Sequence, residues 1–356
     1  MAAIDNKKAL HVFCQLTLKP VPGVGALGYV AGLDSEARTE FLALGDANHV
    51  LIRALGKISL HTCDPELSRW AAEAMADEHE RIRQALPMLS QICSELEAAG
   101  CPVTVMKSLD HWPDLGNDLD LFTTAHAQQV MTVMSERFGA QLEARSWGDR
   151  LANKWNFRVP GLRESVEVHV RRLGQTGEHT ELARRFIRRR VLCEIGGYTF
   201  ALPAPEERIV EATLQRMYRH FYFRLCDIVD TAALVEAGAI DFAELQAASE
   251  SAGIWPGVAT FLRVVSDWIE RYRGKPLELP AAVRAAARFD GDSVHAEDKF
   301  LRVAILPHGA NLYAAQVLRT ASRGDWPATF RLSLLPPLAS AAAVAFRLTG
   351  SDKGIW

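Results

Sequence analysis

The spacing of apolar residues changes abruptly near residue 102, and this change limits the folds that are open to the chain. Residues 36–100 carry apolar side chains at helical intervals, as along 82–98. Beyond residue 102 the sequence favours strands at 103–106, 118–122, 141–145, 155–159 and 165–171, with a helix at 127–138. So many strands with so few helices, in about seventy residues, predict a small mixed sheet rather than a series of parallel βαβ units.

Helical patterns return after Gly196-Gly197 and continue over most of the remaining chain. Pro205-Glu206-Glu207 provides the proline and the acidic residues that favour the first turn of a helix. We therefore predict a predominantly helical α+β fold, in which helical regions flank a small mixed-sheet core. The expected regions are an N-terminal helical region at 1–100, the core at 101–200 and a C-terminal helical domain at 201–356.

Composition excludes several classes of protein. The chain has 356 residues, of which 49% are apolar and 23% charged, as in ordinary globular proteins. A net charge of −3 gives no overall attraction to nucleic acid. The six cysteines form no CxxC pair and no zinc-site spacing, which favours buried thiols. The sequence shows neither a signal peptide nor an apolar segment long enough to span a bilayer, so we expect a cytoplasmic protein without a transmembrane segment.

Two aspartates in one predicted strand are the sharpest chemical feature of the sequence. In an extended strand, Asp118 and Asp120 point to one face, while Leu119 and Leu121 point to the other. Two ionised carboxylates so close together repel each other unless a cation lies between them. Their hard oxygen atoms suit Mg²⁺, or Mn²⁺ in its place. A solvated turn ahead of the strand is the alternative, because Gly116-Asn117 is typical of turns.

A third acid, Glu167, lies in the predicted strand at 165–171. Valines line one face of this strand, and Glu167 and His169 share the other. If this strand neighbours the first, Asp118, Asp120 and Glu167 together could bind two metal ions, which clamp the attacking and leaving oxygens of phosphoryl transfer. An exposed edge strand would also give this pattern, and His169 is open to a supporting, basic or surface role.

Just upstream, the strand at 103–106 runs into Lys107-Ser108 and a short turn. Backbone N–H groups at such a junction form a natural phosphate cradle, and the Lys107 ammonium adds a point charge. We therefore expect Lys107 and Ser108 to contact the phosphates of a nucleotide.

The spacing of these residues resembles that of nucleotidyltransferases of the DNA polymerase β superfamily. These enzymes carry a glycine and a small residue, then about ten residues, a D-x-D strand and a later third acid. Here nine residues separate Ser108 from Asp118-Leu119-Asp120, and Glu167 follows. The chain is most similar to the branch of uncharacterised bacterial nucleotidyltransferases, with which it shares Glu167-Val168-His169, Leu202-Pro203-Ala204-Pro205-Glu206, and a helix containing His220, Arg224, Asp227 and Asp230.

The resemblance covers residues 82–260 and has two departures. Ser108 stands where that branch usually has glycine, and Gly116-Asn117 stands where an arginine often precedes the acids. The resemblance implies transfer of a nucleoside monophosphate from a nucleoside triphosphate, with ATP as the default donor, to a hydroxyl of a small molecule. It implies Asp118, Asp120 and Glu167 as catalytic metal ligands.

Two further functions stay open at this point. One is an RNA-modifying or toxin-like nucleotidyltransferase that holds RNA on the basic run Arg184–Arg190, although such a run is often only a solvated helix face. The other is a non-catalytic nucleotide-binding module of the same fold.

Overall fold

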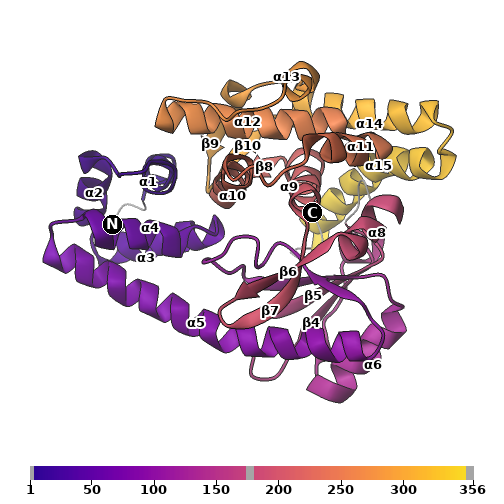
Figure 1. Ribbon diagram of the computed structural model, residues 1–356, viewed down its shortest axis with the longest axis horizontal. Coiled ribbons are helices and arrows are strands. Elements are labelled where there is room, and N and C mark those ends of the chain that lie inside the picture. Colours follow the sequence, from indigo (N-terminus) through magenta and orange to yellow (C-terminus); the bar gives the residue numbers. More distant parts are fainter. Residues whose placement is uncertain (1–3, 174–179, 350–356) are drawn as a thin grey trace.

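The computed structural model describes residues 4–173 and 180–349 of the chain (Figure 1). Its fold is α+β and predominantly helical with a small mixed sheet, which confirms the predicted class. The chain begins with a group of helices, which are α1 (Asn6–Leu18), α2 (Val24–Ala31), α3 (Ser35–Ala47) and α4 (Leu51–His61).

The long helix α5 (Pro65–Ala98) connects this group to the sheet. Asp64 caps its start by accepting the N–H groups of Glu66 and Leu67. Its 34 residues give a length of about 50 Å, so it runs from the N-terminal helices to the far edge of the sheet (Figure 1). Buried apolar residues on its second half pack against the sheet, and these are Ile82, Ala85, Leu86, Leu89, Ile92 and Leu96.

The central sheet has five strands in the order β1-β2-β5-β4-β3. They are β1 (Val103–Val105), β2 (Asp118–Thr123), β3 (Gln141–Leu142), β4 (Lys154–Arg158) and β5 (Ser165–Val170), with α6 (Ala127–Phe138) and α7 (Trp147–Leu151) between them. Only β2 and β5 are parallel, and every other pair is antiparallel. All five predicted strands and the predicted helix are present. The strand expected at 141–145 is shorter, because the chain turns at Ser146, which caps α7.

The expectation that helices resume directly after Gly196-Gly197 is wrong. These glycines, with φ of 57° and 84°, form the two-residue turn of a hairpin between β6 (Arg190–Ile195) and β7 (Tyr198–Pro203). Positive φ at both positions is the geometry of a type I′ hairpin turn, for which glycine is suited. The hairpin follows α8 (Thr180–Arg188), and β7 lies against β1 and α5.

The remaining chain is helical apart from one small sheet. Its helices are α9 (Pro205–Tyr218), α10 (Leu225–Glu236), α11 (Phe242–Ser251), α12 (Trp255–Arg273), α13 (Ala281–Ala286), α14 (Ala310–Ser322) and α15 (Trp326–Thr349), with short turns η1 (Gly291–Ser293) and η2 (Ile305–Gly309). The strands β8 (Tyr222–Phe223), β9 (Val294–Glu297) and β10 (Phe300–Val303) pair in the order β8-β10-β9.

Two apolar cores organise the molecule. One lies between α5 and the central sheet, whereas the other joins α1–α4 to α9, α10 and α12. The N-terminal helices thus pack with the C-terminal helices, and the sheet lies below both (Figure 1). The three-region division made from the sequence stays a prediction. None of the helices over the described part of the chain combines the length and apolar character needed to cross a membrane.

Candidate active site

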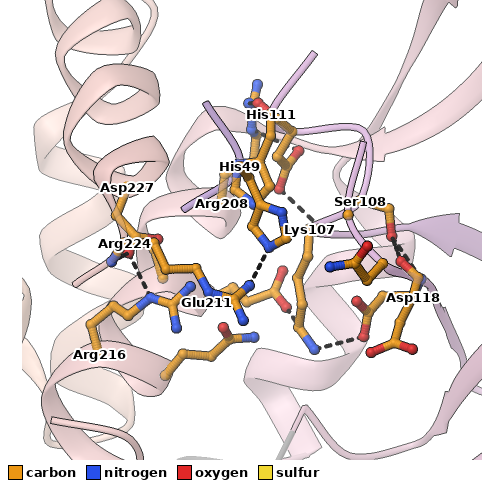
Figure 2. Close-up of a pocket in the computed structure, with 16 residues that line it drawn as sticks. His49, Lys107, Ser108, His111, Asp118, Arg208, Glu211, Arg216, Arg224 and Asp227 are labelled. Atoms are coloured by element: carbon orange, nitrogen blue, oxygen red, sulfur yellow. Dashed lines mark hydrogen bonds and ion pairs between the residues drawn. The ribbon is translucent and has the colours of Figure 1, made fainter. Parts of the chain in front are cut away.

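The two aspartates of β2 face a pocket between the sheet and the C-terminal helices. Leu119 and Leu121 are fully buried in the core beneath them, as the alternation predicted. Asp118 is exposed at the edge of the pocket and Asp120 is buried, yet both line it (Figure 2). The pocket encloses about 610 Å³ of space free of protein atoms, part of it open to solvent.

Strand β5 brings the third predicted acid to the same place. The parallel register pairs Asp120 with Glu167, so the two side chains leave the same face of the sheet on neighbouring strands. His169 follows on that face and is fully buried. The ligand atoms of Asp120, Glu167 and His169 all lie within 4.8 Å of one another. The predicted neighbourhood of the two strands is therefore confirmed, and its spacing suits a shared metal site.

Lys107 places its ammonium among these acids. Its Nζ lies 2.8 Å from Asp120 Oδ1 and 4.0 Å from Glu167 Oε1. The backbone of Lys107 has φ of 60°, a conformation that non-glycine residues rarely adopt and that is concentrated at functional sites. Burial alone would lower the pKa of Lys107, but the neighbouring carboxylates outweigh burial and raise the pKa above its ordinary value. The carboxylates of Asp120 and Glu167 therefore already lie close to one positive charge, that of the Lys107 ammonium.

Ser108 ties the loop after β1 to strand β2. Its Oγ donates to the carbonyl oxygen of Asp118 at 2.9 Å and accepts from the N–H of Asp120 at 2.7 Å. The N–H of Ser108 bonds to Met106 O, and the N–H of Lys107 bonds to Asp110 Oδ2. Because both N–H groups have acceptors inside the loop, they do not form the backbone phosphate cradle expected there. Ser108 instead holds the aspartate strand in position.

The acids have unequal protonation. Partial desolvation in the pocket, followed by the charges of Asp120 and Glu167, raises the pKa of Asp118 to about 6. Burial would also raise the pKa of Glu167, but a hydrogen bond and charge from His169, together with the charge of Lys154, hold that pKa well below its usual value. Lys154 Nζ lies 2.7 Å from Glu167 Oε2. Glu167 is thus ionised and balanced, whereas Asp118 forms no ion pair among the described residues, and only the charges of Lys154 and Lys107 lower its pKa.

The opposite wall of the pocket belongs to helix α9. Arg208, Glu211 and Arg216 of this helix line the pocket on the side opposite Asp118 (Figure 2). Glu211 is buried, and neither of its carboxylate oxygens has a hydrogen-bond partner among the described residues. Its nearest cation is Lys107, at 3.8 Å. Burial raises the pKa of Glu211 to about 8, so this side chain is mostly protonated at pH 7.

Two further residues close this wall from distant parts of the sequence. Arg224, which precedes α10, reaches His49, which precedes α4, and its Nη1 bonds to His49 Nε2. Asn48 holds the two segments together, because its Oδ1 accepts from Leu225 N and its carbonyl oxygen accepts from Cys226 N. The pocket therefore exists only when the N-terminal helices, the sheet and the C-terminal helices are assembled.

Buried ion pairs fix the loop that leads into β2. Arg81 of α5 bonds to Glu164 and to the carbonyl oxygen of Leu115. Arg53 of α4 pairs with Asp230 at 2.7 Å and with Asp114 at 3.3 Å. These arginines position Asp118 from outside the sheet.

Sequence reasoning gave no site role to His49, Arg208, Glu211 or Arg216. The three positions on α9, which are Arg208, Glu211 and Arg216, form a polar stripe at helical spacing, which is typical of a solvent-exposed face. Arg224 was predicted only as part of the pattern shared with the uncharacterised nucleotidyltransferases, without a role in the site. Its burial beside His49 depends on tertiary packing, for which one sequence carries no signal.

The basic run at 184–190 lies elsewhere and is largely engaged. Arg185 pairs with Glu207 at 2.6 Å, and Arg189 pairs with Glu206 at 2.7 Å. Arg190 bonds to Glu97 of α5. These contacts anchor α8 and the hairpin to neighbouring helices. They give three arginines of the run a structural role that needs no bound polyanion.

Comparisons with known proteins identify the family to which the chain belongs. A family model described as "Uncharacterised nucleotidyltransferase" matches residues 34–270, which is more than half of the chain. Among solved structures, the chain is similar to an antigenic nucleotidyltransferase-like protein from Paracoccidioides brasiliensis, with 15% identity and a TM-score of 0.34, over 58% of this chain and 95% of that chain. No curated protein matches the sequence. The chain belongs to the family of uncharacterised nucleotidyltransferases.

Proposed function

We propose that this protein transfers a nucleoside monophosphate from a nucleoside triphosphate, with ATP as the default donor, to a hydroxyl of a small-molecule acceptor. The observation that carries the proposal is the register of β2 and β5, which places Asp120 beside Glu167 at the edge of a pocket. Asp118, on the same strand as Asp120, adds a third carboxylate, which forms no ion pair among the described residues. Carboxylates grouped in this way are the usual ligands of the metal in phosphoryl transfer.

Asp118, Asp120 and Glu167 would hold Mg²⁺, or Mn²⁺ in its place. Their donor atoms are hard oxygens, and the Lys107 ammonium among them indicates that the group favours a positive charge. When bound, the metal supplies charge neutralisation for the phosphate oxygens of the donor. A hydrogen bond with His169 and an ion pair with Lys154 hold the Glu167 carboxylate in place.

The reaction itself exchanges one P–O bond for another. The acceptor hydroxyl oxygen forms a bond to the α-phosphorus, and its proton passes to water. The bond from the α-phosphorus to the bridging oxygen of the β-phosphate breaks, and pyrophosphate leaves with that electron pair. Lys107 lies close enough to the acids to bind phosphate oxygens when the donor occupies the pocket.

The two other functions are less well supported. Three arginines of the run at 184–190 already pair with Glu206, Glu207 and Glu97, which argues against this run as an RNA site. A non-catalytic module has no need of acids that bind a catalytic metal, and the pairing of Asp120 with Glu167 on neighbouring strands favours the enzyme.

The test is turnover with each nucleoside triphosphate labelled at its α-phosphorus. The protein is incubated with Mg²⁺ and either a small-molecule extract or an RNA fraction, and both transferred label and pyrophosphate are measured. We expect label in a small molecule, with a loss of about 100-fold or more in Asp120→Asn, since one group that stabilises transition-state charge is worth this much. Calorimetry should show weak Mg²⁺ binding that tightens with the nucleotide.

Asp292→Asn is the matched control, because Asp292 is exposed, does not line the pocket and pairs only with Arg271 among the described residues. It should leave turnover unchanged. Pyrophosphate release that persists in Asp120→Asn or in excess chelator would contradict the proposal. Nucleotide binding without any pyrophosphate favours the non-catalytic module, and label in the RNA fraction favours the RNA-modifying enzyme.

A further inference from the structure

Most cations that line the pocket are matched by a carboxylate. Arg208 Nε lies 2.9 Å from Asp110 Oδ1, and Arg216 Nε lies 2.7 Å from Asp227 Oδ2. Lys107 pairs with Asp120 at 2.8 Å. In each pair a carboxylate of the protein balances the positive charge.

Arg224 is different from these cations. Within the described ranges, its guanidinium has no ion pair with a carboxylate, and its side-chain contact is the hydrogen bond to His49 Nε2. Its Nε is buried and has no hydrogen-bond partner there. An arginine whose Nε–H lacks a partner and whose charge no carboxylate balances is suited to bind the oxygens of a phosphate group. The side chain points into the pocket, toward Glu211 and Lys107 (Figure 2).

His49 holds this arginine without cancelling its charge. The imidazole is buried, and burial together with the charge of Arg224 holds its pKa well below the ordinary value, so it is neutral. A neutral Nε2 accepts the hydrogen bond from Arg224. His49 itself is fixed by a left-handed backbone, with φ of 50°, and by stacking on His111 at a centroid distance of 5.1 Å. A carboxylate at this position would have neutralised the guanidinium.

We propose that Arg224, positioned by His49, binds the β- and γ-phosphates of the donor nucleotide. This inference rests on the proposed function and adds the orientation of the donor in the pocket. Over the described ranges, neither Arg224 on the helical wall nor Asp118 on the sheet wall forms an ion pair. A triphosphate that carries Mg²⁺ and spans the pocket would satisfy both, with its α-phosphate and the cation near the acids and its terminal phosphates near Arg224.

The proposal is tested by binding rather than turnover. Titration calorimetry compares ATP, AMP and inorganic triphosphate in the presence of Mg²⁺. We expect Arg224→Ala to weaken triphosphate and ATP by about 10- to 100-fold, which is the usual value of a charge-assisted hydrogen bond to a phosphate. AMP lacks the terminal phosphates, so its affinity should change by less than about twofold.

Three variants separate binding from folding. Arg224→Gln removes the charge but keeps a donor for His49, and it should weaken triphosphate as Arg224→Ala does without a change in melting temperature. His49→Phe removes the acceptor that positions the guanidinium, so it should weaken triphosphate several-fold, and His49→Gln should restore most of this loss. Arg137→Ala is the matched control, because Arg137 is an exposed arginine of α6 outside the pocket.

Several outcomes would overturn the proposal. Wild-type protein that fails to bind inorganic triphosphate has no such subsite. Arg224→Ala and Arg224→Gln that bind ATP and triphosphate as tightly as wild type, or that lose AMP to the same extent, also contradict it. In these cases nucleotidyl transfer still stands if Asp120→Asn abolishes turnover, so the two proposals fail separately.

Discussion

The buried acid Glu211 allows a quantitative test of the pocket's electrostatics. Its carboxyl group has no hydrogen-bond partner in the described part of the chain, and burial raises its pKa from 4.5 to about 8. Between these two pH values the folded protein keeps a proton that the unfolded chain releases. Because an acid with a raised pKa favours folding only while it is protonated, stability is highest below pH 4.5 and falls as the pH rises to 8.

The magnitude follows from the width of this window. Each pH unit inside it changes the free energy of unfolding by about 1.4 kcal/mol for one proton. From pH 5 to pH 7, Glu211 should therefore cost the wild-type protein about 3 kcal/mol. Glu211→Gln has nearly the same shape as the protonated acid but does not titrate, so the variant should gain about 3 kcal/mol relative to wild type over this range.

The assay is urea unfolding followed by tryptophan fluorescence at pH 5, 6, 7 and 8, in chelator. Other acids with shifted pKa values are the same in both proteins, so their effects cancel in the difference. Glu278→Gln changes an exposed carboxylate, 89% of whose side chain is accessible, and it should show no pH-dependent gain. A difference between Glu211→Gln and wild type that stays constant from pH 5 to pH 8 would show that Glu211 is ionised in the folded protein, and the reasoning would be refuted.

Two other substitutions test the acid side of the pocket. Asp118→Asn removes a charge that Asp120 and Glu167 repel, so the melting temperature in chelator should stay level or rise slightly; because Asp118 is exposed, solvent screening limits the gain to about 1 kcal/mol or less. A clear loss of stability would indicate instead that Asp118 forms a structural turn. Lys107→Ala leaves buried acids without their cation, so urea unfolding should show a loss of about 3 kcal/mol. Steady-state kinetics of this variant should show a larger rise in KM for the nucleotide than fall in kcat.

The acid side of the site could be predicted from the sequence because its signals are local. Alternation of Leu119 and Leu121 with two aspartates fixes which side chains enter the core, and the valines around Glu167 do the same in β5. Both strands are short and rich in β-forming residues, so their pairing followed from the pattern. The predicted contact of Asp120 and Glu167 depended only on that pairing.

The basic side could not be predicted in the same way. The helical spacing of Arg208, Glu211 and Arg216 is the same for a solvated face and for a buried pocket wall, and only packing against the sheet distinguishes them. His49 precedes Arg224 by more than a hundred residues, and their contact depends on how α4 and α10 meet. The hairpin at Gly196-Gly197 was not predicted for a different reason, since a pair of glycines fits the end of the sheet-containing region as well as a tight hairpin turn.

The distribution of charge in the pocket relates the acids of the sheet to the arginine on the opposite wall. Three acids on adjacent strands repel one another, and the protein limits this repulsion with Lys107 at Asp120 and Lys154 at Glu167. Asp118 forms no such ion pair among the described residues, and desolvation, followed by the charges of Asp120 and Glu167, raises its pKa. On the opposite wall, Arg224 is the cation held by a neutral group. A pocket that needed only to be stable would pair these two charges with internal partners, as it pairs the others. Among the described residues, Asp118 and Arg224 are left without an ion pair, and a metal-bound polyphosphate would satisfy both. Its metal ion would balance Asp118, and its phosphates would balance Arg224.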